Sequence, residues 1–383
     1  MTTLPEPSPT ARNISLRLET ELQSQIRNAG GWISFAHYME QALYAHGLGY
    51  YAAGSRKLGA AGDFVTAPEL TPLFGATLAR QIAELLPQTA GTLYEFGAGS
   101  GRLAVDLLRE LEALNALPTR YAIIDLSPDL IERQRETLSA GLPHLLARIE
   151  WLDTLPDTLD GVIIGNEVLD AMPCELLHWT PEPLQRGVSV GADGFVWQDR
   201  PIIDPELRQL ATQLKIENDD YLSEININNL AFIRTLAARL TRGAILLLDY
   251  GFPQAEYYHA ERDMGTLIGH YRHHTIDDPF YLPGLMDLTC HVDFSAMAQS
   301  GIDAGLDLIG YTTQAQFLIN CGITEVMQRL DPNEVKTWAP QASAVQKLMS
   351  PEEMGELFKV IGFGKGVGIA WRGFDHGDRC HTL

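Results

Sequence analysis

Three glycines at alternate positions are the residues with the clearest chemical implication. Gly97, Gly99 and Gly101 follow an apolar run that reaches Glu95, and a helical pattern begins directly after them. The order strand, glycine turn, helix lets a ligand lie against main-chain amides at a helix N-terminus. A dinucleotide fingerprint needs a further glycine at the sixth position of G-x-G-x-x-G, where this chain has Arg102. The spacing therefore disfavours a nicotinamide dinucleotide as the ligand.

A carboxylate follows the next apolar run. Asp125 ends the segment 121–125, which comes after the glycines at roughly the 20-residue spacing at which an acid binds ribose hydroxyls. The alternative interpretation is an acid that only forms a turn at the end of a strand. Together with the glycine loop, Asp125 predicts a ligand that contains a nucleoside.

A third group of polar side chains follows the apolar run 161–165. Asn166, Glu167 and Asp170 come directly after it. Ligands of an open α/β sheet bind beyond the carboxyl ends of the strands, so these residues are candidates for chemistry. The alternative is a helix N-terminus, with Asn166 as its cap and the two acids in its first turn. The two interpretations are compatible.

The elements that must position these residues alternate along the chain. Strand-like runs occur near 92–96, 120–125, 147–151, 160–165, 243–251 and 306–312, with helical patterns between the earlier ones. This alternation predicts an α/β fold with a parallel sheet. We also expect helical structure from 15 to about 48 and over 352–361, a capping box from Thr66 to Glu69, and a final strand near 366–372.

Composition narrows the class of protein. The chain has 383 residues, of which 45% are hydrophobic and 20% charged, as in ordinary globular proteins. Its net charge of −21 argues against nucleic acid as a partner. The four cysteines have no C-x-x-C spacing, so neither a zinc site nor a disulfide framework is expected. No apolar run reaches the ~18 residues of a membrane span, and the N-terminus lacks a hydrophobic signal core, so we expect a cytoplasmic protein.

Four blocks of sequence resemble the MidA-like methyltransferases, relatives of the mitochondrial complex I assembly factor that methylates arginine. They are Gly62-Asp-Phe-Val-Thr-Ala-Pro-Glu69, Glu95-Phe-Gly-Ala-Gly-Ser-Gly101, Asn166-Glu-Val-Leu-Asp-Ala-Met-Pro173 and Asp287-Leu-Thr-Cys-His-Val-Asp-Phe294. The resemblance implies a seven-strand Rossmann-like methyltransferase sheet with an N-terminal helical cap and an inserted helix/strand region. It implies S-adenosylmethionine as the methyl donor and a protein substrate, by resemblance a subunit of a respiratory complex. A small-molecule acceptor and a non-catalytic assembly protein are the alternatives.

The resemblance also divides the chain and assigns roles within it. The cap and lid take up 14–90, the donor-binding half of the core 91–180, an insertion 181–242 and the second half of the core 243–383. Glu167, with Asp170, is expected to hold the guanidinium of an arginine, because carboxylates bind that group through paired, charge-assisted hydrogen bonds. Asn166 is placed near the methionine part of the donor, and Glu95 at its amino group.

Further residues receive weaker assignments. Asp153 lies where the adenine is expected, although an aspartate in a loop is often only solvated. A lid over the donor would include Asp63, Phe64 and Thr66, and capping explains Thr66 equally well. In the long loop 265–294 the candidates for binding the acceptor are His273, His274, Asp287, His291 and Asp293. These histidines and acids have no recognised metal-ligand spacing, so no metal is expected.

Overall fold

The chain forms two compact units in the computed structural model, which describes residues 4–53, 66–214, 216 and 220–383. Unit 1 consists of Met1–Phe64, Leu169–Ala231 and Gln254–Asp293, and unit 2 of Val65–Val168, Phe232–Pro253 and Phe294–Leu383. Each unit is therefore assembled from three separate stretches of sequence. The four segments expected from the sequence stay a prediction.

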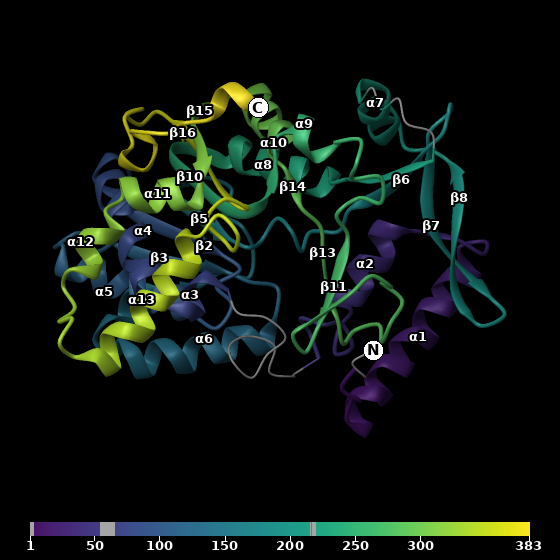
Figure 1. The fold of residues 1–383 in the computed structure, drawn as a ribbon, viewed down its shortest axis with the longest axis horizontal. Helices are drawn as coiled ribbons and strands as arrows, with labels where there is room; N and C mark the ends of the chain where they lie inside the picture. The colour runs from purple at the N-terminus through teal and green to yellow at the C-terminus, as the bar shows by residue number, and fades with distance from the viewer. Residues whose placement is uncertain (1–3, 54–65, 215, 217–219) are drawn as a thin grey trace. The chain divides into compact units, whose positions relative to one another are not determined.

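Unit 2 is built on a mixed sheet with the strand order β15-β16-β10-β5-β2-β3-β4 (Figure 1). Its strands are β2 (Thr92–Phe96), β3 (Arg120–Ile124), β4 (Ile149–Trp151), β5 (Leu159–Asn166), β10 (Leu240–Phe252), β15 (Asp307–Thr313) and β16 (Phe358–Lys365). Neighbouring strands from β10 to β4 run parallel, and β16 runs antiparallel to both β10 and β15. The α/β fold expected from the sequence is confirmed. The sheet has eight strands in all, seven of which lie on this path.

The strand order reverses between β2 and β5. From β2 the chain proceeds outward to β3 and β4, whereas β5 lies on the other side of β2 and leads to β10. Open α/β sheets bind ligands beyond the carboxyl ends of the strands at such a reversal. Two of the segments predicted to do chemistry lie at this edge: 97–101 directly follows β2, and 166–167 comprises the last residue of β5 and the residue after it.

Helices supply the rest of unit 2. They are α3 (Ala67–Leu70), α4 (Pro72–Leu85), η1 (Leu86–Gln88), α5 (Arg102–Ala113), α6 (Pro128–Gly141), η2 (Pro143–Arg148), α10 (Phe294–Asp303), α11 (Gln314–Asn320), α12 (Ile323–Met327), α13 (Val335–Met349), η3 (Arg372–Phe374) and η4 (Cys380–Thr382). A further helix, α8 (Ile227–Arg239), lies between β9 and β10 in the sequence and crosses the boundary between the units. Helix α5 buries Leu103, Leu107 and Leu111, a spacing of four residues that forms one apolar stripe against the core.

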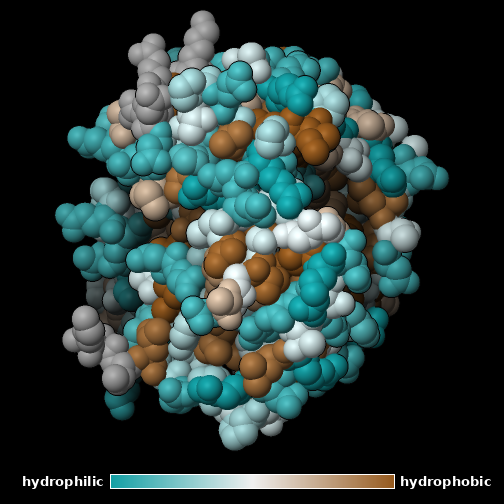
Figure 2. All heavy atoms as spheres, turned by 90° about the vertical axis from the view of Figure 1, so that its right-hand side faces the viewer, coloured by the Kyte–Doolittle hydropathy of each residue, from teal (hydrophilic) through white to brown (hydrophobic). Residues whose placement is uncertain are grey.

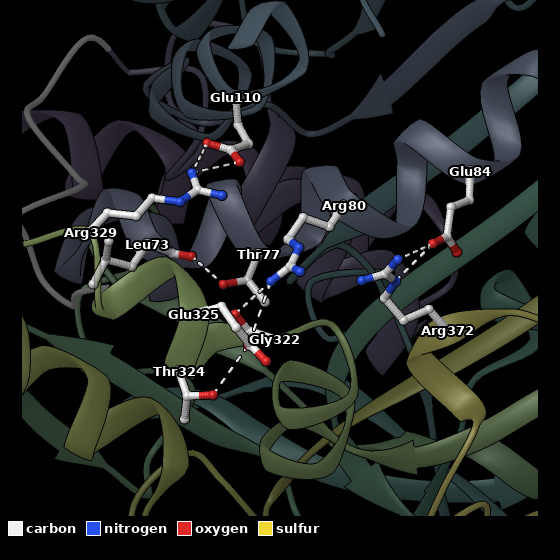
Figure 3. A network of polar contacts seen from close by, with 10 residues as sticks. All are labelled: Leu73, Thr77, Arg80, Glu84, Glu110, Gly322, Thr324, Glu325, Arg329 and Arg372. Carbon is white, nitrogen blue, oxygen red and sulfur yellow. Dashed lines mark hydrogen bonds and ion pairs between the residues drawn. The ribbon is translucent and has the colours of Figure 1, made fainter. Parts of the chain in front are cut away.

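Ion pairs and a hydrogen bond attach the C-terminal part of unit 2 to α4 and α5 (Figure 3). Arg329 Nη1 donates to both carboxylate oxygens of Glu110 on α5, at 2.8 and 2.7 Å. Arg80 on α4 donates to the carbonyl of Gly322 at 2.8 Å, and Arg372 pairs with a glutamate on α4. These contacts join segments that lie more than 200 residues apart in the sequence.

Unit 1 contains two smaller sheets. One has the order β1-β7-β6-β9 with β8 beside β7, and the other the order β12-β11-β13. The strands of unit 1 are β1 (Ile33–Ser34), β6 (Glu175–Trp179), β7 (Leu184–Gly191), β8 (Gly194–Pro201), β9 (Tyr221–Ile225), β11 (Ile268–Tyr271), β12 (His274–Ile276), β13 (Asp287–Thr289) and β14 (Val292–Asp293). Its helices are α1 (Pro9–Asn28), α2 (Phe35–Tyr44), α7 (Pro205–Gln213) and α9 (Gln254–Tyr257).

The surface of unit 1 includes an exposed edge strand. Strand β8 lies off the path β1-β7-β6-β9 and, among the strands that the structure describes, pairs with β7 alone; its Val196 and Trp197 are 43% and 36% exposed. Figure 2 shows apolar side chains interspersed with hydrophilic ones on the corresponding side of the molecule. No helix among the described residues combines the length and the apolar composition needed to cross a bilayer.

The structure differs from several sequence-based expectations. The helical structure expected from 15 to about 48 is present as two helices, α1 and α2, with a break at Gly30 and Gly31, which both have positive φ. The segment 265–294 is not one long loop, because it contains β11, β12, β13 and β14. Residues 352–361 form turns that lead into β16, so neither the helix expected there nor the strand near 366–372 is present. Pairing with β10 and β15 decides the conformation of β16 over its local pattern.

Candidate active site

The glycine loop follows β2 and adopts backbone angles that other residues avoid. Gly97, Gly99 and Gly101 have φ of 62°, 53° and 81°, in the left-handed region. A Cβ atom on Gly97 would lie 3.0 Å from Val168 Cγ2. Helix α5 begins at the next residue, Arg102. The loop therefore presents bare backbone at a helix N-terminus, as the sequence predicted.

Asp125 lies directly after β3, at the adjacent strand end. Its Oδ1 accepts a hydrogen bond from Ser127 N at 2.9 Å, and its Oδ2 accepts one from Gln134 Nε2 at 2.7 Å. Burial raises the pKa of Asp125, and these hydrogen bonds act against that shift. The carboxylate is thus held in one orientation. Leu126, the next residue, is 81% exposed.

Sequence reasoning missed Gln134. Its side-chain amide donates to Gly99 O at 3.1 Å as well as to Asp125, and its Oε1 accepts from Trp151 Nε1 at 3.0 Å. The buried residues of α6 are Leu130, Gln134 and Leu138, a spacing of four residues. A polar residue in the middle of an apolar stripe was the signal that could have identified it.

Glu95 is the penultimate residue of β2 and is 2% exposed. Tyr121 donates a hydrogen bond from its hydroxyl to Glu95 Oε2 at 2.8 Å. Burial raises the pKa of Glu95 to about 8; the hydrogen bond from Tyr121 acts in the opposite direction, and the charge of Asp125 adds to the rise. A cation beside Glu95 would favour its ionised form.

Asn166 is the last residue of β5, and Glu167 follows it directly. Glu167 has a φ of 53°, a left-handed conformation that is uncommon for a residue with a side chain. Its main-chain N donates to Leu248 O at 2.9 Å, and the N of Val168 donates to Asp249 Oδ2 at 3.1 Å. Asp249 is fully buried and was not predicted. No helix follows Asn166, so the helix-capping interpretation was wrong.

The side chain of Asn166 is only partly satisfied. Its Nδ2 donates to Glu167 Oε1 at 3.0 Å. Its Oδ1 is buried and has no hydrogen-bond partner within the described part of the chain. A buried acceptor without a donor is costly, and a ligand that brings an N–H group would satisfy it.

The candidates for binding the acceptor from Asp170 onward belong to unit 1, where Asp170 and Asp287 are 5% and 2% exposed. Tyr51 donates to both carboxylate oxygens of Asp287, at 3.0 and 3.1 Å. Burial raises the pKa of Tyr51 well above its usual value, and the charges of Asp287 and Asp170 add to the rise. Unit 1 therefore brings these two predicted acids to the surroundings of one tyrosine.

Four consecutive carbonyls hold the chain around Asp170. Asp170 O accepts from Cys290 N at 3.1 Å, and Ala171 O accepts from Tyr44 Oη at 2.9 Å. The carbonyls of the next two residues accept from Asn226 Nδ2 at 3.1 Å and Asn228 Nδ2 at 2.6 Å. Donors from three separate parts of unit 1 thus fix the backbone of this segment.

Glu224, like Asp249, is a buried carboxylate that the sequence analysis did not predict, and it binds the backbone of the segment before β11. Glu224 is 1% exposed, and its Oε1 accepts from the main-chain N of Thr266 and of Leu267, both at 2.8 Å. Its Oε2 accepts from Tyr257 Oη at 3.0 Å. Thr266 Oγ1 in turn accepts from His291 N at 2.9 Å. Glu224 therefore positions the backbone of His291.

The structure places the other candidates as follows. His273 is exposed at the turn between β11 and β12, with a φ of 64°, and the adjacent His274 contacts the carbonyl of Arg272. Asp293 is half-buried and raises the pKa of Tyr258, which burial raises first. Asp153 is exposed two residues beyond β4. Among the residues that the structure describes, no three or more histidines, cysteines or acids are grouped as metal ligands.

The lid candidates lie at the edge of the described chain. Asp63 and Phe64 fall outside the described residues. Thr66 precedes α3 but makes no side-chain capping bond, so the predicted capping box is wrong. The carboxylate of Glu69 instead accepts a hydrogen bond from the hydroxyl of Ser100, in the glycine loop.

Comparisons with known proteins agree with this geometry. Residues 77–312 match a family described as "Putative S-adenosyl-L-methionine-dependent methyltransferase". The chain is 32% identical over 368 residues to the mitochondrial protein arginine methyltransferase NDUFAF7 of Danio rerio, covering 86% of this chain and 83% of that protein. The human protein of that name is 30% identical, with coverages of 88% and 81%. A crystal structure from Burkholderia thailandensis, bound to S-adenosyl-homocysteine, is 49% identical over the full length of both chains, with a TM-score of 0.96.

Proposed function

This chain belongs to the family of S-adenosylmethionine-dependent methyltransferases, and we propose that it methylates an arginine side chain of a protein. The methyl donor is S-adenosylmethionine, as the family and the structural relative bound to S-adenosyl-homocysteine indicate. The arginine acceptor is supported by the names of relatives about 30% identical and by the acid at the end of β5.

The donor-binding residues that we propose all belong to unit 2. The glycine loop would bind the methyl donor against its bare backbone. A side chain at Gly97 would be crowded, because its Cβ would lie 3.0 Å from Val168 Cγ2. Asp125 would accept the ribose hydroxyls with the lone pairs that Ser127 and Gln134 leave open. Asp153 remains our candidate at the adenine, and Leu126 joins it because its apolar side chain is exposed beside Asp125.

The methionine end of the donor has two candidate partners. Asn166 Oδ1 lacks a hydrogen-bond donor in the described part of the chain and would accept one from an ammonium group. Glu95 would interact with the same positive group, directly or through water, which would lower its raised pKa. Both residues follow from the sequence prediction, and the orphan oxygen of Asn166 is the independent structural support.

Glu167 is the residue that we assign to the acceptor. S-adenosylmethionine supplies an activated methyl group, so the enzyme's main task is to align the nucleophile with it. A carboxylate can bind a guanidinium through two N–H groups and orient the third nitrogen. The left-handed backbone of Glu167 and the bond from Asn166 hold its carboxylate in place. This geometry is the observation that supports the arginine acceptor best.

The other acceptor-binding assignments stay proposals from the sequence. They comprise Asp170, His273, His274, Asp287, His291 and Asp293 in unit 1, and the lid residues Asp63, Phe64 and Thr66. Asp170 and Asp287 are the strongest of these, because both are buried carboxylates held by hydrogen-bonded backbone or by Tyr51. By family resemblance the protein substrate is a subunit of a respiratory complex, and the expected location is the cytoplasm.

The test is transfer of labelled methyl from S-adenosylmethionine to proteins of a lysate from cells that lack the enzyme. The labelled proteins are hydrolysed and their amino acids separated. Label in methylarginine that is strongly reduced with Glu167→Gln supports the proposal. Label only in small molecules would show a different acceptor. Absence of any label, with S-adenosyl-homocysteine still bound, would indicate a binding protein without turnover and overturn the proposed activity.

A further inference from the structure

Gln134 has a fully buried side-chain amide. All of its hydrogen-bonding groups contact residues at the carboxyl ends of the strands, where we propose that the methyl donor binds. Its two Nε2 hydrogens go to Gly99 O at 3.1 Å and Asp125 Oδ2 at 2.7 Å, and its Oε1 accepts from Trp151 Nε1 at 3.0 Å. Gly99 follows β2, Asp125 follows β3 and Trp151 ends β4. One side chain therefore connects the carboxyl ends of three adjacent parallel strands.

The identity of its partners sets the orientation of the amide. Gly99 O and the Asp125 carboxylate accept hydrogen bonds, whereas the indole N–H of Trp151 only donates. A flipped amide would place its oxygen against two acceptors and its NH₂ against a donor. Gln134 is therefore the side chain that matches this set, and glutamate or leucine would not.

The backbone of the glycine loop also packs against this residue. A Cβ atom on Gly101 would lie 3.1 Å from Gln134 Cα and 3.4 Å from its carbonyl oxygen. The loop thus contacts α6 through main chain at Gly101 and through the amide at Gly99. Movement of Gln134 would shift the loop, the carboxylate and the indole together.

We propose that Gln134 is a positioning residue for the nucleoside of the methyl donor, a role that rests on the donor site proposed above. It holds the loop carbonyl, the Asp125 carboxylate and the Trp151 ring in one arrangement before the donor binds. Donation to Oδ2 restricts rotation of the carboxylate, so its remaining lone pairs face the ligand at no further entropic cost. The guanidinium of Arg135 lies over the same indole, 5.0 Å from the ring centroid, and adds a cation–π contact.

The experiment is calorimetric titration of Gln134→Leu and Gln134→Glu with S-adenosyl-homocysteine and with adenosine. Both variants lose the donation to Gly99 and Asp125, and glutamate adds a negative charge beside Asp125. We expect Kd for both ligands to rise about tenfold to about a hundredfold, with the larger loss for glutamate, since hydrogen bonds to charged groups contribute about 1.5–3 kcal/mol. The same loss with adenosine locates the effect at the nucleoside.

Gln81→Leu is the matched control. Gln81 on α4 is equally buried, and its Oε1 accepts a hydrogen bond from Gly373 N at 2.8 Å. Gly373 is not among the residues that we propose to bind the methyl donor. Gln81→Leu should lower the melting temperature and leave Kd unchanged. The proposal is overturned if the Gln134 variants lose only stability and bind adenosine as the wild type does. Failure of the wild type to bind either ligand would instead overturn the donor site itself.

Discussion

Asn166 Nδ2 lies 3.0 Å from Glu167 Oε1 and donates a hydrogen bond to it, so the last residue of β5 holds the carboxylate of the next. The backbone at Glu167 is left-handed, and Val168 N is held by the buried Asp249. Strained backbone of this kind persists where the surroundings over-determine it, and it concentrates at functional sites. The arrangement places a carboxylate at the edge of the sheet where the strand order reverses.

Glu167→Gln should therefore reduce turnover with little effect on donor binding. Glutamine keeps the shape and the bond from Asn166 but removes the negative charge that would orient a guanidinium. We expect kcat to fall by about 10²-fold or more, the scale of one aligned electrostatic contact, while Kd for S-adenosyl-homocysteine stays within about twofold. Steady-state methyl transfer at saturating substrate measures kcat, and calorimetry measures Kd. Normal turnover would remove Glu167 from the mechanism.

Gly97→Ala tests the glycine loop. The substitution places a methyl group 3.0 Å from Val168 Cγ2 at a φ of 62°. We expect the affinity for the methyl donor to fall at least about tenfold, because the backbone must shift where we propose that the ligand approaches it.

Gly305→Ala is the control, since Gly305 also has a positive φ of 86° but no atom lies within 4 Å of its added Cβ. Both variants should lose about 1–2 kcal/mol of stability, and only the first should lose affinity. Equal donor affinities would contradict the loop as the site.

Glu95 should release a proton when the donor binds. Its pKa of about 8 keeps the carboxyl mostly protonated at pH 7. The donor's ammonium group would lower that pKa, so binding should release up to about one proton. Calorimetry in two buffers with different ionisation enthalpies measures this number. Glu95→Gln should abolish the proton release. Identical heats for the wild type in both buffers would show that Glu95 does not interact with the donor's ammonium group.

The raised pKa of Glu95 also predicts how the stability of the protein without bound methyl donor depends on pH. Between the ordinary pKa of 4.5 and the raised value of about 8, the unfolded chain loses the proton that folded Glu95 keeps. The free energy of unfolding should therefore fall as pH rises through this window. Glu95→Gln, which still accepts from Tyr121, should flatten that part of the profile in urea unfolding measured at pH 5 and pH 8.

Local patterns in the sequence predicted the parts of the site that follow the central strands. The glycines, Asp125 and Asn166 all come directly after apolar runs, and β2, β3 and β5 were located to within one residue. Gln134 and Glu224 were missed because their partners, Gly99 and Thr266 among them, are distant in the sequence and only folding brings them together. Strand β16 was missed for a related reason, because its pairing with β10 spans more than 100 residues.

Arg186→Leu should destabilise unit 1 in a pH-dependent way. Asp199 is paired with Arg186 through Nε at 2.8 Å and Nη2 at 2.9 Å, and with His178. Burial acts to raise the pKa of Asp199, but the bonds from Arg186 and His178 lower it overall. The pair's contribution is thus present above the unfolded pKa of about 3.9 and lost as pH falls through the folded value.

Urea unfolding at pH 7 should show a loss of about 1–3 kcal/mol for Arg186→Leu, and the loss should shrink at pH 3. Arg12→Leu is the matched control, because the pair of Arg12 with Glu6 is exposed by 55% and 82%. Its loss should stay below about 1 kcal/mol at both values. A loss for Arg186→Leu that does not depend on pH would assign its effect to packing rather than charge.

Tyr44→Phe should weaken binding of the protein acceptor and spare the donor. The ring of Tyr44 stacks on Tyr51 at 5.5 Å, and its hydroxyl donates to Ala171 O, beside Asp170. Phenylalanine keeps the stack, so the main change is a looser backbone next to that acid. We expect KM for the acceptor to rise about fivefold, the equivalent of one hydrogen bond of about 1 kcal/mol, with Kd for S-adenosyl-homocysteine unchanged.

Tyr221→Phe is the matched control. It removes a comparable hydrogen bond to a main-chain carbonyl, that of His259, and should leave both constants unchanged. If the two variants behave alike, the segment around Asp170 does not bind the acceptor.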